Sequence, residues 1–344
     1  MSKPQILLTG ATGMVGFRVL VLALEAGYRV RVVVRNQEGF ERIKLLAPVA
    51  PYVDWFESFL VPDMTLPGAY DDAVSGVEYI IHVASPLALP HLTDFENDLI
   101  KPAMLGTIGM LESAYKTSGI KKIVITSSSA AIKPPSDLIR GTGPTEPFNE
   151  KSRAPHPEGP YSNVLEAYMA SKALSLEATE TFIKERKPSF DVINIGPGYI
   201  VGRDDTVTQA DGICKGTNGF AMGQLLGKPI PYPVASLMSH LDDVARVHVE
   251  SLSPSIKGNH FFLISAESPD GVTWDRALEI AREHYAKEVE DGLFKVDAGT
   301  GTVRLRADSS YAEKMLGFKL KTYEQAVKDV VDHYLELVGR TSPK

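Results

Sequence analysis

A tyrosine and a lysine stand four positions apart in the segment Tyr168-Met-Ala-Ser-Lys172. If this segment is helical, both side chains lie on the same face of the helix. A phenol has an ordinary pKa of about 10, so unaided it donates a proton only weakly near neutrality. A lysine ammonium one helical turn away favours the phenolate and lowers that pKa. The pair is therefore suited to proton transfer, although this spacing alone is commonplace.

Three consecutive serines, residues 127–129, follow an apolar segment that is typical of a buried strand. Ser128 could hydrogen-bond a carbonyl oxygen and hold it against the phenol of Tyr168. Hydride from a reduced nicotinamide would then attack the carbonyl carbon while Tyr168 protonates the oxygen. Lowering the pKa of the phenol to about 7 needs roughly 4 kcal/mol, of which a partly desolvated charge pair supplies a good share. Serines at a strand end are usually turn formers, so the hypothesis depends on the whole set of motifs.

Glycines at positions 10, 13 and 16 lie between the apolar run Ile6–Leu8 and a helix-length apolar segment. Gly10 permits a tight turn, Gly13 lets a ligand approach the backbone, and Gly16 allows close packing of helix and strand. The amides at the start of the helix then face an anion. An ordinary strand–turn–helix junction is the alternative interpretation. The residues predicted to contact a dinucleotide pyrophosphate here are Gly10, Thr12, Gly13, Met14 and Val15.

The second predicted strand, residues 29–34, ends at Arg35. An acidic residue at this position would bind the adenosine ribose 2′-hydroxyl and repel a 2′-phosphate, whereas arginine can pair with that phosphate. No acidic residue follows the strand before Glu38, so we predict NADP (NADPH) rather than NAD. Arg42 and Lys44 could add positive charge, although a solvated helix face explains each of them alone.

Two further strand ends offer contacts for the cofactor. Asp63 and Met64 follow the third predicted strand and are expected beside the adenine ring, although Asp63 could equally cap a turn. Small residues follow the fourth predicted strand and leave space for a ligand, as the carboxyl edge of an open α/β sheet requires. These residues are Ala84, Ser85 and Pro86, directly after Val83.

Strands and helices alternate along the first 200 residues, which predicts a doubly wound parallel sheet of the Rossmann type. The predicted strands are 6–8, 29–34, 53–61, 78–83, 122–126 and 190–195, and the predicted helices are 17–26, 94–117 and 160–187. Residues 133–160 are rich in proline and predict a long surface loop. Further on we expect helices at 242–252, 273–285 and 323–337 and a strand at 259–264. Residues 1–200, completed by segments from about 240–265, are thus predicted to form the NADP-binding domain, and residues 201–344 a smaller mixed α/β substrate-binding lobe that is not independent.

Composition narrows the class of protein. The chain has 344 residues, a net charge of −7 and no long basic run, which argues against nucleic acid as the main partner. No stretch approaches the roughly 18 apolar residues of a membrane helix, and residues 1–4 leave no room for a signal peptide, so a cytoplasmic protein is expected. The single cysteine, Cys214, excludes an internal disulfide, and the eight histidines show no metal-ligand spacing, so no metal is predicted.

Several motifs together resemble the extended short-chain dehydrogenase/reductases, in particular the dihydroflavonol reductase, cinnamoyl-CoA reductase and fungal aldehyde or methylglyoxal reductase branch. The matching segments are Thr9-Gly-Ala-Thr-Gly-Met-Val-Gly16, His82-Val-Ala-Ser-Pro86, Val124-Ile-Thr-Ser-Ser128, Tyr168-Met-Ala-Ser-Lys172, Gly196-Pro-Gly-Tyr199 and His240-Leu-Asp-Asp-Val-Ala245. The resemblance implies that Ser128, Tyr168 and Lys172 are catalytic and that Lys172 also binds the nicotinamide ribose. Aligning Thr126-Ser-Ser with the family motif selects Ser128, with Ser129 as the alternative. The resemblance further implies that the cofactor is lined by residues 83–86 and by Thr126, Pro197, Gly198 and Ile200.

The chemistry and the resemblance lead to one main hypothesis and two alternatives. The first is an NADPH-dependent reductase that converts an aldehyde or ketone to an alcohol. The alternatives are an NAD-dependent nucleotide-sugar epimerase or dehydratase, and a non-catalytic NADP-binding sensor or scaffold protein. The partner is expected to be a small carbonyl compound, and monomer and homodimer are both open. Candidate pocket residues, each also explicable by packing, are Tyr161, Tyr199, Phe220 and Met222.

Overall fold

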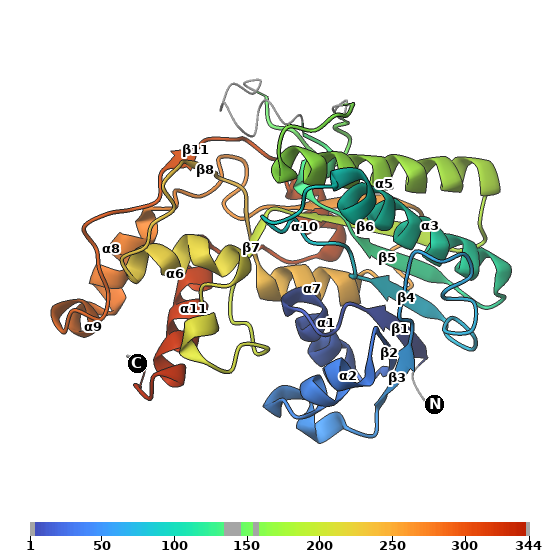
Figure 1. The fold of residues 1–344 in the computed structure, drawn as a ribbon, viewed down its shortest axis with the longest axis horizontal. Helices are drawn as coiled ribbons and strands as arrows, with labels where there is room; N and C mark the ends of the chain where they lie inside the picture. Colours follow the sequence, from blue (N-terminus) through green and yellow to red (C-terminus); the bar gives the residue numbers. More distant parts are fainter. Residues whose placement is uncertain (1–3, 134–145, 154–157, 342–344) are drawn as a thin grey trace. The chain divides into compact units, whose positions relative to one another are not determined.

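The computed structural model describes residues 4–133, 146–153 and 158–341. Its centre is a seven-stranded sheet in the order β10-β6-β5-β4-β1-β2-β3 (Figure 1). The pairings from β3 through β6 are parallel, and helices flank the sheet, so the predicted doubly wound fold is confirmed. The strands are β1 (Gln5–Thr9), β2 (Arg29–Val34), β3 (Phe56–Leu60), β4 (Tyr79–His82), β5 (Lys122–Thr126), β6 (Asp191–Pro197) and β10 (His260–Ile264).

The strand order changes direction between β1 and β4, because the chain first adds β2 and β3 on one side and then returns to the other side. At such a point the loops that leave neighbouring strands diverge, and open α/β sheets bind ligands there, at the carboxyl ends of the strands. The central strands are buried on both faces, as the fully inaccessible Ile6, Leu7 and Leu8 of β1 show. This burial explains their continuous apolar sequence.

Two layers of helices flank the sheet. Helices α3 (Lys101–Lys116) and α5 (Val164–Arg186) lie together on one face, and α1 (Met14–Glu25) lies on the opposite face (Figure 1). Met110 and Leu111 of α3 and Phe182 of α5 share one apolar core with side chains of β1, β4 and β5. Helix α2 (Gln37–Lys44) follows β2 in the chain, and helix α7 (Leu241–Glu250) precedes β10.

Some predicted boundaries were wrong. The third strand begins at Phe56 rather than at residue 53, because residues 47–52 form a 3-10 helix. The long helix predicted over 94–117 is divided into a π-helical turn, Glu96–Ile100, and α3. Helix α5 begins at Val164 because the Asn163 side chain accepts hydrogen bonds from the amides of residues 165 and 166.

The chain divides into two compact units. Unit 1 comprises residues 1–135, 151–196 and 245–262, and unit 2 comprises residues 136–150, 197–244 and 263–344. Most of the loop predicted over 133–160 lies outside the described residues. Within the described ranges, no helix is both long and apolar enough to cross a bilayer.

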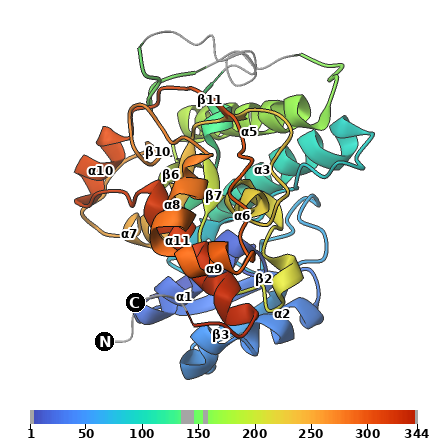
Figure 2. The same cartoon turned by 90° about the vertical axis from the view of Figure 1, so that its left-hand side faces the viewer.

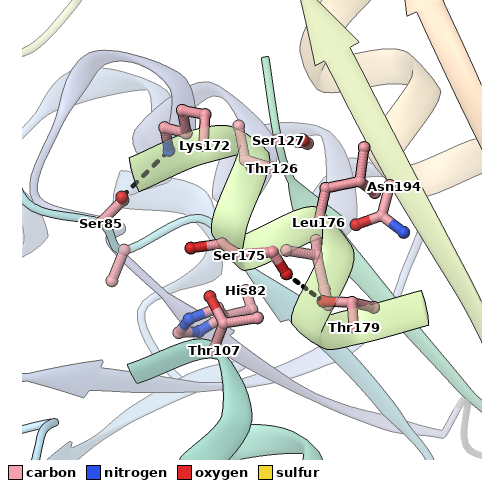
Figure 3. A pocket seen from close by; sticks show the side chains of 12 residues that line it. His82, Ser85, Thr107, Thr126, Ser127, Lys172, Ser175, Leu176, Thr179 and Asn194 are labelled. Carbon is pink, nitrogen blue, oxygen red and sulfur yellow. Dashed lines mark hydrogen bonds between the residues drawn. The ribbon is translucent and has the colours of Figure 1, made fainter. Parts of the chain in front are cut away.

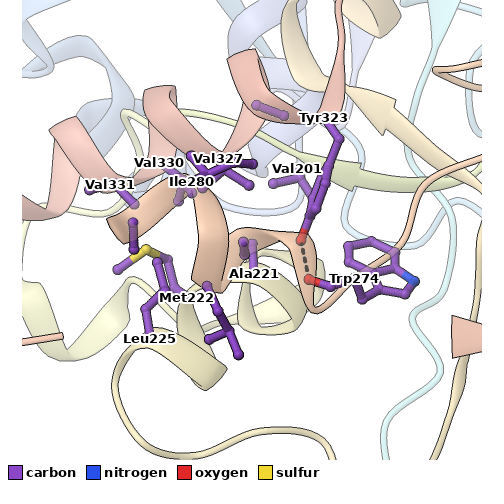
Figure 4. Close-up of a cluster of buried hydrophobic side chains, with 14 of the residues drawn as sticks. Val201, Ala221, Met222, Leu225, Trp274, Ile280, Tyr323, Val327, Val330 and Val331 are labelled. Atoms are coloured by element: carbon purple, nitrogen blue, oxygen red, sulfur yellow. Dashed lines mark hydrogen bonds between the residues drawn. The ribbon is translucent and has the colours of Figure 1, made fainter. Parts of the chain in front are cut away.

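Unit 2 has its own apolar core, which surrounds the fully buried Trp274 (Figure 4). Tyr323 donates a hydrogen bond to the Trp274 carbonyl oxygen at 3.0 Å and thereby joins α11 to this core. Helix α11 also packs against α8 (Figure 2). The helices of unit 2 are α6 (Gly219–Leu225), α8 (Arg276–His284), α9 (Ala286–Glu290), α10 (Ser310–Leu316) and α11 (Tyr323–Leu337), and its short strands are β7 (Tyr199–Val201), β8 (Val234–Ala235), β9 (Met238–His240) and β11 (Thr302–Val303).

Candidate active site

Helix α5 carries both residues of the predicted Tyr–Lys pair in unit 1. Tyr168 and Lys172 lie on the same face of the helix, and the Lys172 Nζ lies 5.6 Å from the centre of the Tyr168 ring. The tyrosine ring packs against an apolar cluster that includes Ala167 and Ala170 of the same helix. Lys172 is only 8% exposed. The spacing in sequence therefore brings the two groups together in a site that is largely closed to water.

The turn after β5 brings a serine to Tyr168. Ser127 donates its amide proton to the Ile195 carbonyl oxygen of β6, which continues the sheet by one residue. Ser128 then leaves the strand, and its hydroxyl oxygen accepts a hydrogen bond from the Ala130 amide at 3.1 Å. A hydrogen bond also joins the side chains of Ser128 and Tyr168. Among the three serines, this contact distinguishes Ser128, whereas Ser127 lines a small cavity that Lys172 also lines.

The pKa of Tyr168 differs in direction from the one expected from the sequence. Burial raises the pKa of the Tyr168 phenol above its usual value, and the hydrogen bond with Ser128 opposes this only in part. Burial also lowers the pKa of the Lys172 ammonium to about 8. The Lys172 ammonium donates to Ser85 Oγ, 3.0 Å away, and the net shift of the Tyr168 pKa is upward rather than downward as expected. In this state of the protein, Tyr168 is therefore a protonated phenol at neutral pH.

A buried hydrogen-bond chain fixes the ends of β1 and β4 beneath this site. The Thr9 hydroxyl oxygen accepts the Ala84 amide proton at 3.0 Å and lies 2.9 Å from His82 Nδ1. Burial, assisted by the nearby Lys172 ammonium, lowers the pKa of His82 to about 4. His82 is therefore neutral near pH 7. Sequence reasoning missed the roles of Thr9 and His82, although polar residues at the ends of apolar strands were the available signal.

The glycine turn has the geometry of an anion-binding site. Gly10 has φ +77°, and a Cβ at this position would lie 2.8 Å from the Ala84 amide nitrogen. Gly13 is the N-cap of α1 and brings no side-chain cap, and the first turn of the helix contains no acidic residue. The nearest described atom to a Cβ on Gly13 would be 3.8 Å away, so a ligand can approach the backbone there. Met14 and Val15 begin the helix, so their amides have no partner within it, and their contact with a pyrophosphate stays a prediction.

The two arginines near the end of β2 differ in their surroundings. Arg35 is exposed and directly follows the strand. Arg42 lies on α2 and donates a hydrogen bond to the Thr12 carbonyl oxygen at 3.0 Å, so it contacts the glycine turn. Asn36 caps α2 by accepting the Gly39 amide proton. Positive charge is thus present both directly after β2 and next to the glycine turn.

Three other predicted cofactor contacts in unit 1 have partners within the protein. The Asp63 carboxylate accepts hydrogen bonds from the Thr65 hydroxyl and amide at 2.6 and 2.8 Å, and these bonds lower its pKa. Asp63 therefore closes a turn, which was the stated alternative. Met64 packs against Gly106 of α3, where a Cβ would lie 3.3 Å from its terminal methyl group. The Thr126 hydroxyl lies 2.7 Å from Nε2 of the buried His248, which the sequence did not single out.

The remaining predicted cofactor contacts, Pro197, Gly198 and Ile200, belong to unit 2. Pro197 ends β6, and the Gly198 amide donates to Ser239 Oγ at 2.9 Å. The carbonyl oxygen of Ile200 accepts a hydrogen bond from the Thr217 hydroxyl. Their contact with a cofactor stays a prediction. Of the candidate pocket residues, Met222 is fully buried in the core, Tyr199 and Phe220 form an edge-to-face pair at 4.8 Å, and Tyr161 packs against the cluster that contains Tyr168.

One group of possible metal ligands occurs among the described residues: His240, Asp242 and Asp329 in unit 2. The His240 Nδ1 accepts the Asp242 amide proton at 3.1 Å, and its Nε2 lies 2.9 Å from the Asp329 carboxylate. The Lys321 ammonium pairs with Asp242 at 2.7 Å. The cluster thus contains one imidazole, two carboxylates and a neighbouring ammonium group.

Comparisons with known proteins agree with this architecture. Residues 6–253 match the profile of the NAD dependent epimerase/dehydratase family. The chain is 38% identical over 346 residues to a ketoreductase, CTB6, from Cercospora nicotianae, with 98% of this chain and 96% of the relative covered. It is 29% identical to a putative NADPH-dependent methylglyoxal reductase, GRP2, from Candida albicans, with 96% and 98% covered. The structure of yeast methylglyoxal/isovaleraldehyde reductase Gre2 complexed with NADPH superimposes with a TM-score of 0.81 at 24% identity, covering 98% and 99% of the two chains.

Proposed function

The chain belongs to the NAD dependent epimerase/dehydratase family of extended short-chain dehydrogenase/reductases, and from this premise we propose that it is an NADPH-dependent carbonyl reductase. It would reduce an aldehyde or ketone to an alcohol. The observation that supports this best is the triplet in unit 1, in which Ser128 hydrogen-bonds Tyr168 and Lys172 Nζ lies 5.6 Å from the tyrosine ring. The ketoreductase and methylglyoxal reductase names of the relatives support the same class of reaction.

The residues of unit 1 fit a dinucleotide. The uncapped start of α1, the open backbone at Gly13 and the absence of acid in the first turn suit a pyrophosphate. Arg35 and Arg42 would pair with a ribose 2′-phosphate, which favours NADPH over NADH. Val83, Ala84 and Ser85 leave β4 beside Lys172 and would line the nicotinamide end. When bound, NADPH would supply the hydride.

The protein's own part in the reaction is to hold and protonate the carbonyl oxygen. The Ser128 hydroxyl would donate a hydrogen bond to that oxygen and so place it beside the phenol. Tyr168, protonated near neutral pH, would give its proton to the oxygen as negative charge develops there. The Lys172 ammonium would then stabilise the phenolate left behind until solvent returns the proton. Because the pKa of Lys172 is about 8, most of the ammonium stays charged at pH 7.

The test is consumption of NADPH with a panel of ketones and aldehydes, followed by absorbance. The wild type is expected to turn over, and Tyr168→Phe to lose about 10²- to 10⁴-fold in kcat, the usual contribution of a general acid. Tyr115→Phe, which removes a hydroxyl from an exposed tyrosine of α3, is the matched control and should keep full activity. Equal activity of Tyr168→Phe and the control would refute the assignment.

Two outcomes of the same assay would favour the alternatives. Purified protein that already contains tightly bound NAD and consumes no NADPH would favour an epimerase or dehydratase. NADPH binding without turnover of any carbonyl compound would favour a sensor or scaffold protein. The roles of the candidate pocket residues Tyr199 and Phe220 in substrate binding would be tested by the same panel of carbonyl compounds with variants of these two residues.

A further inference from the structure

A buried histidine reaches the end of the strand that precedes the three serines. His248 lies on α7, in the part of this helix that belongs to unit 1, and its side chain is fully buried. Its Nε2 lies 2.7 Å from the hydroxyl oxygen of Thr126, the last residue of β5. The two residues are 122 positions apart in the chain. The proposed reaction assigns no task to His248.

The pairing of β5 with its two neighbours in the sheet stops at different residues. With β4 the last pair is Ile125 with His82. With β6 the pairing continues to Thr126 and Ile195, and the Ser127 amide then donates to the Ile195 carbonyl oxygen at 2.7 Å. The chain leaves the sheet after this bond. The bond of the Thr126 side chain with α7 therefore attaches the strand end to a further element, beyond the point where pairing with β4 has ended.

This strand end also positions the serine of the candidate active site. Ser128 lies two residues after Thr126, and because peptide units are planar and nearly rigid, a movement of the strand end is passed on to the serine. The Ser128 hydroxyl accepts the Ala130 amide proton at 3.1 Å and is hydrogen-bonded to Tyr168. Thr126 also lines the small cavity that Lys172 lines (Figure 3). The end of β5 thus lies next to both helical residues of the proposed triplet.

A second strand of the sheet ends with the same pair of residue types. Thr9 is the last residue of β1, and its hydroxyl oxygen lies 2.9 Å from Nδ1 of the buried His82. The same hydroxyl accepts the Ala84 amide proton and so holds the chain that leaves β4. Burying polar groups is costly, so packing alone does not call for a threonine and a histidine at either place. Their use at two strand ends beside the candidate site indicates that they hold these ends in place.

We propose that His248 is a positioning residue for the serine of the active site. Through its bond with Thr126 it fixes the end of β5 and so keeps the Ser128 hydroxyl bonded to Tyr168. In the proposed reaction this serine places the carbonyl oxygen beside the phenol, and a misplacement of about 1 Å at such a position can lower kcat by about 10²-fold. The effect on catalysis rests on the proposed function, whereas the positioning of Ser128 against Tyr168 does not.

The first test is NMR of protein labelled with ¹³C at tyrosine Cζ, recorded near neutral pH without cofactor or substrate. The Tyr168 signal is assigned by its loss in Tyr168→Phe, and Ser128→Ala shows where it lies when the serine hydroxyl is gone. His248→Leu is expected to move the signal toward its position in Ser128→Ala. His248→Gln, whose amide can still bond the Thr126 hydroxyl, should keep the signal close to its wild-type position. A wild-type signal in folded His248→Leu would overturn the proposal.

Ser113→Ala separates positioning from stability. Ser113 is buried and its hydroxyl donates to Asp71 at 2.6 Å, so this variant also loses a bond between distant residues of unit 1. It should leave the Tyr168 signal in place, and an equal displacement in this control would overturn the proposal. If His248→Leu does not fold, the double variant Thr126→Val/His248→Leu serves, because removing both partners leaves neither of them unsatisfied. The double variant should show the displaced signal, and a wild-type signal there would count against the proposal in the same way.

Turnover supplies a second test if the protein is a reductase. The kcat of His248→Leu should fall by about tenfold or more with the KM for NADPH unchanged, because the serine contacts the carbonyl oxygen rather than the dinucleotide. His248→Gln should recover most of the lost kcat, and a wild-type kcat in His248→Leu would overturn the proposal. The NMR test needs no turnover. A wild type that reduces no carbonyl compound would therefore refute the reductase proposal alone, and the Tyr168 signal would still decide whether His248 positions Ser128.

Discussion

Gly16 offers a sharp test of how closely the glycine turn packs on α1. A glycine inside a helix normally costs about 1 kcal/mol relative to alanine, so Gly→Ala at an open helical site stabilises a protein. At Gly16, however, a Cβ would lie 2.1 Å from the Gly10 carbonyl oxygen and 2.5 Å from its carbonyl carbon. Relief requires a movement of about 1 Å by backbone rather than by a flexible side chain.

That movement is resisted on both sides of the turn. The Gly10 carbonyl oxygen accepts the Gly13 amide proton at 3.1 Å, and Gly10 itself packs against the Ala84 backbone. Overpacking of this kind costs roughly 1–3 kcal/mol, and it more than cancels the gain in helix propensity. We therefore expect Gly16→Ala to lower the free energy of unfolding by about 1–2 kcal/mol. A shift of the turn by 1 Å should also weaken NADPH binding by about tenfold or more.

The assay is urea denaturation together with fluorescence titration of NADPH. Gly109→Ala is the matched control, because Gly109 is also helical and its Cβ would meet only the Met64 carbonyl oxygen, at 3.9 Å. This variant should be stabilised by up to about 1 kcal/mol and bind NADPH normally. If Gly16→Ala matches Gly109→Ala both in the free energy of unfolding and in the affinity for NADPH, then the inference that α1 closely approaches the glycine turn is wrong.

Two further predictions concern charge. The pKa of His82 is about 4 in the folded protein, against an ordinary value of 6.5. Between these values the unfolded chain binds more protons than the folded protein, so the free energy of unfolding falls as the pH drops through that range. The loss from this group between pH 6.5 and 4 is about 3 kcal/mol, and urea denaturation should show that His82→Asn, which cannot titrate there, escapes it. Arg35→Ser should raise the Kd for NADPH at least about tenfold while changing that for NADH little, the loss expected for one charge-assisted contact to phosphate. Equal losses for both dinucleotides would show that Arg35 does not contact the 2′-phosphate.

The sequence was most informative where local signals were strong. The strands Arg29–Val34 and Lys122–Thr126 have the predicted bounds because each is a short segment rich in β-branched residues. Helix α11 also has its predicted bounds, since Thr322 and Gln325 form a capping box at its start. The pairing of Tyr168 with Lys172 follows from helical periodicity alone.

Features that depend on contacts between residues far apart in the chain could not be predicted from local sequence patterns. The bonds of Thr9 with His82 and of Thr126 with His248 join residues 73 and 122 positions apart. The short strands β8 and β11 contain two residues each, which is too few for a periodic pattern. The direction of the Tyr168 pKa shift was also missed, because the depth of burial is a property of the folded protein. For the same reason, the orientation of Lys172 toward Ser85 could not be foreseen.

The most direct measurement of the central claim is isotope transfer in a single turnover. NADPH that carries deuterium at the hydride position of its nicotinamide is mixed with excess wild-type enzyme and a ketone substrate, and the alcohol is analysed by mass spectrometry. Deuterium bound to the carbinol carbon of the alcohol is predicted for the wild type, with formation slowed by about 10²-fold or more in Tyr168→Phe. Alcohol without deuterium at that carbon, or an equal rate in the Tyr168 variant, would contradict the account.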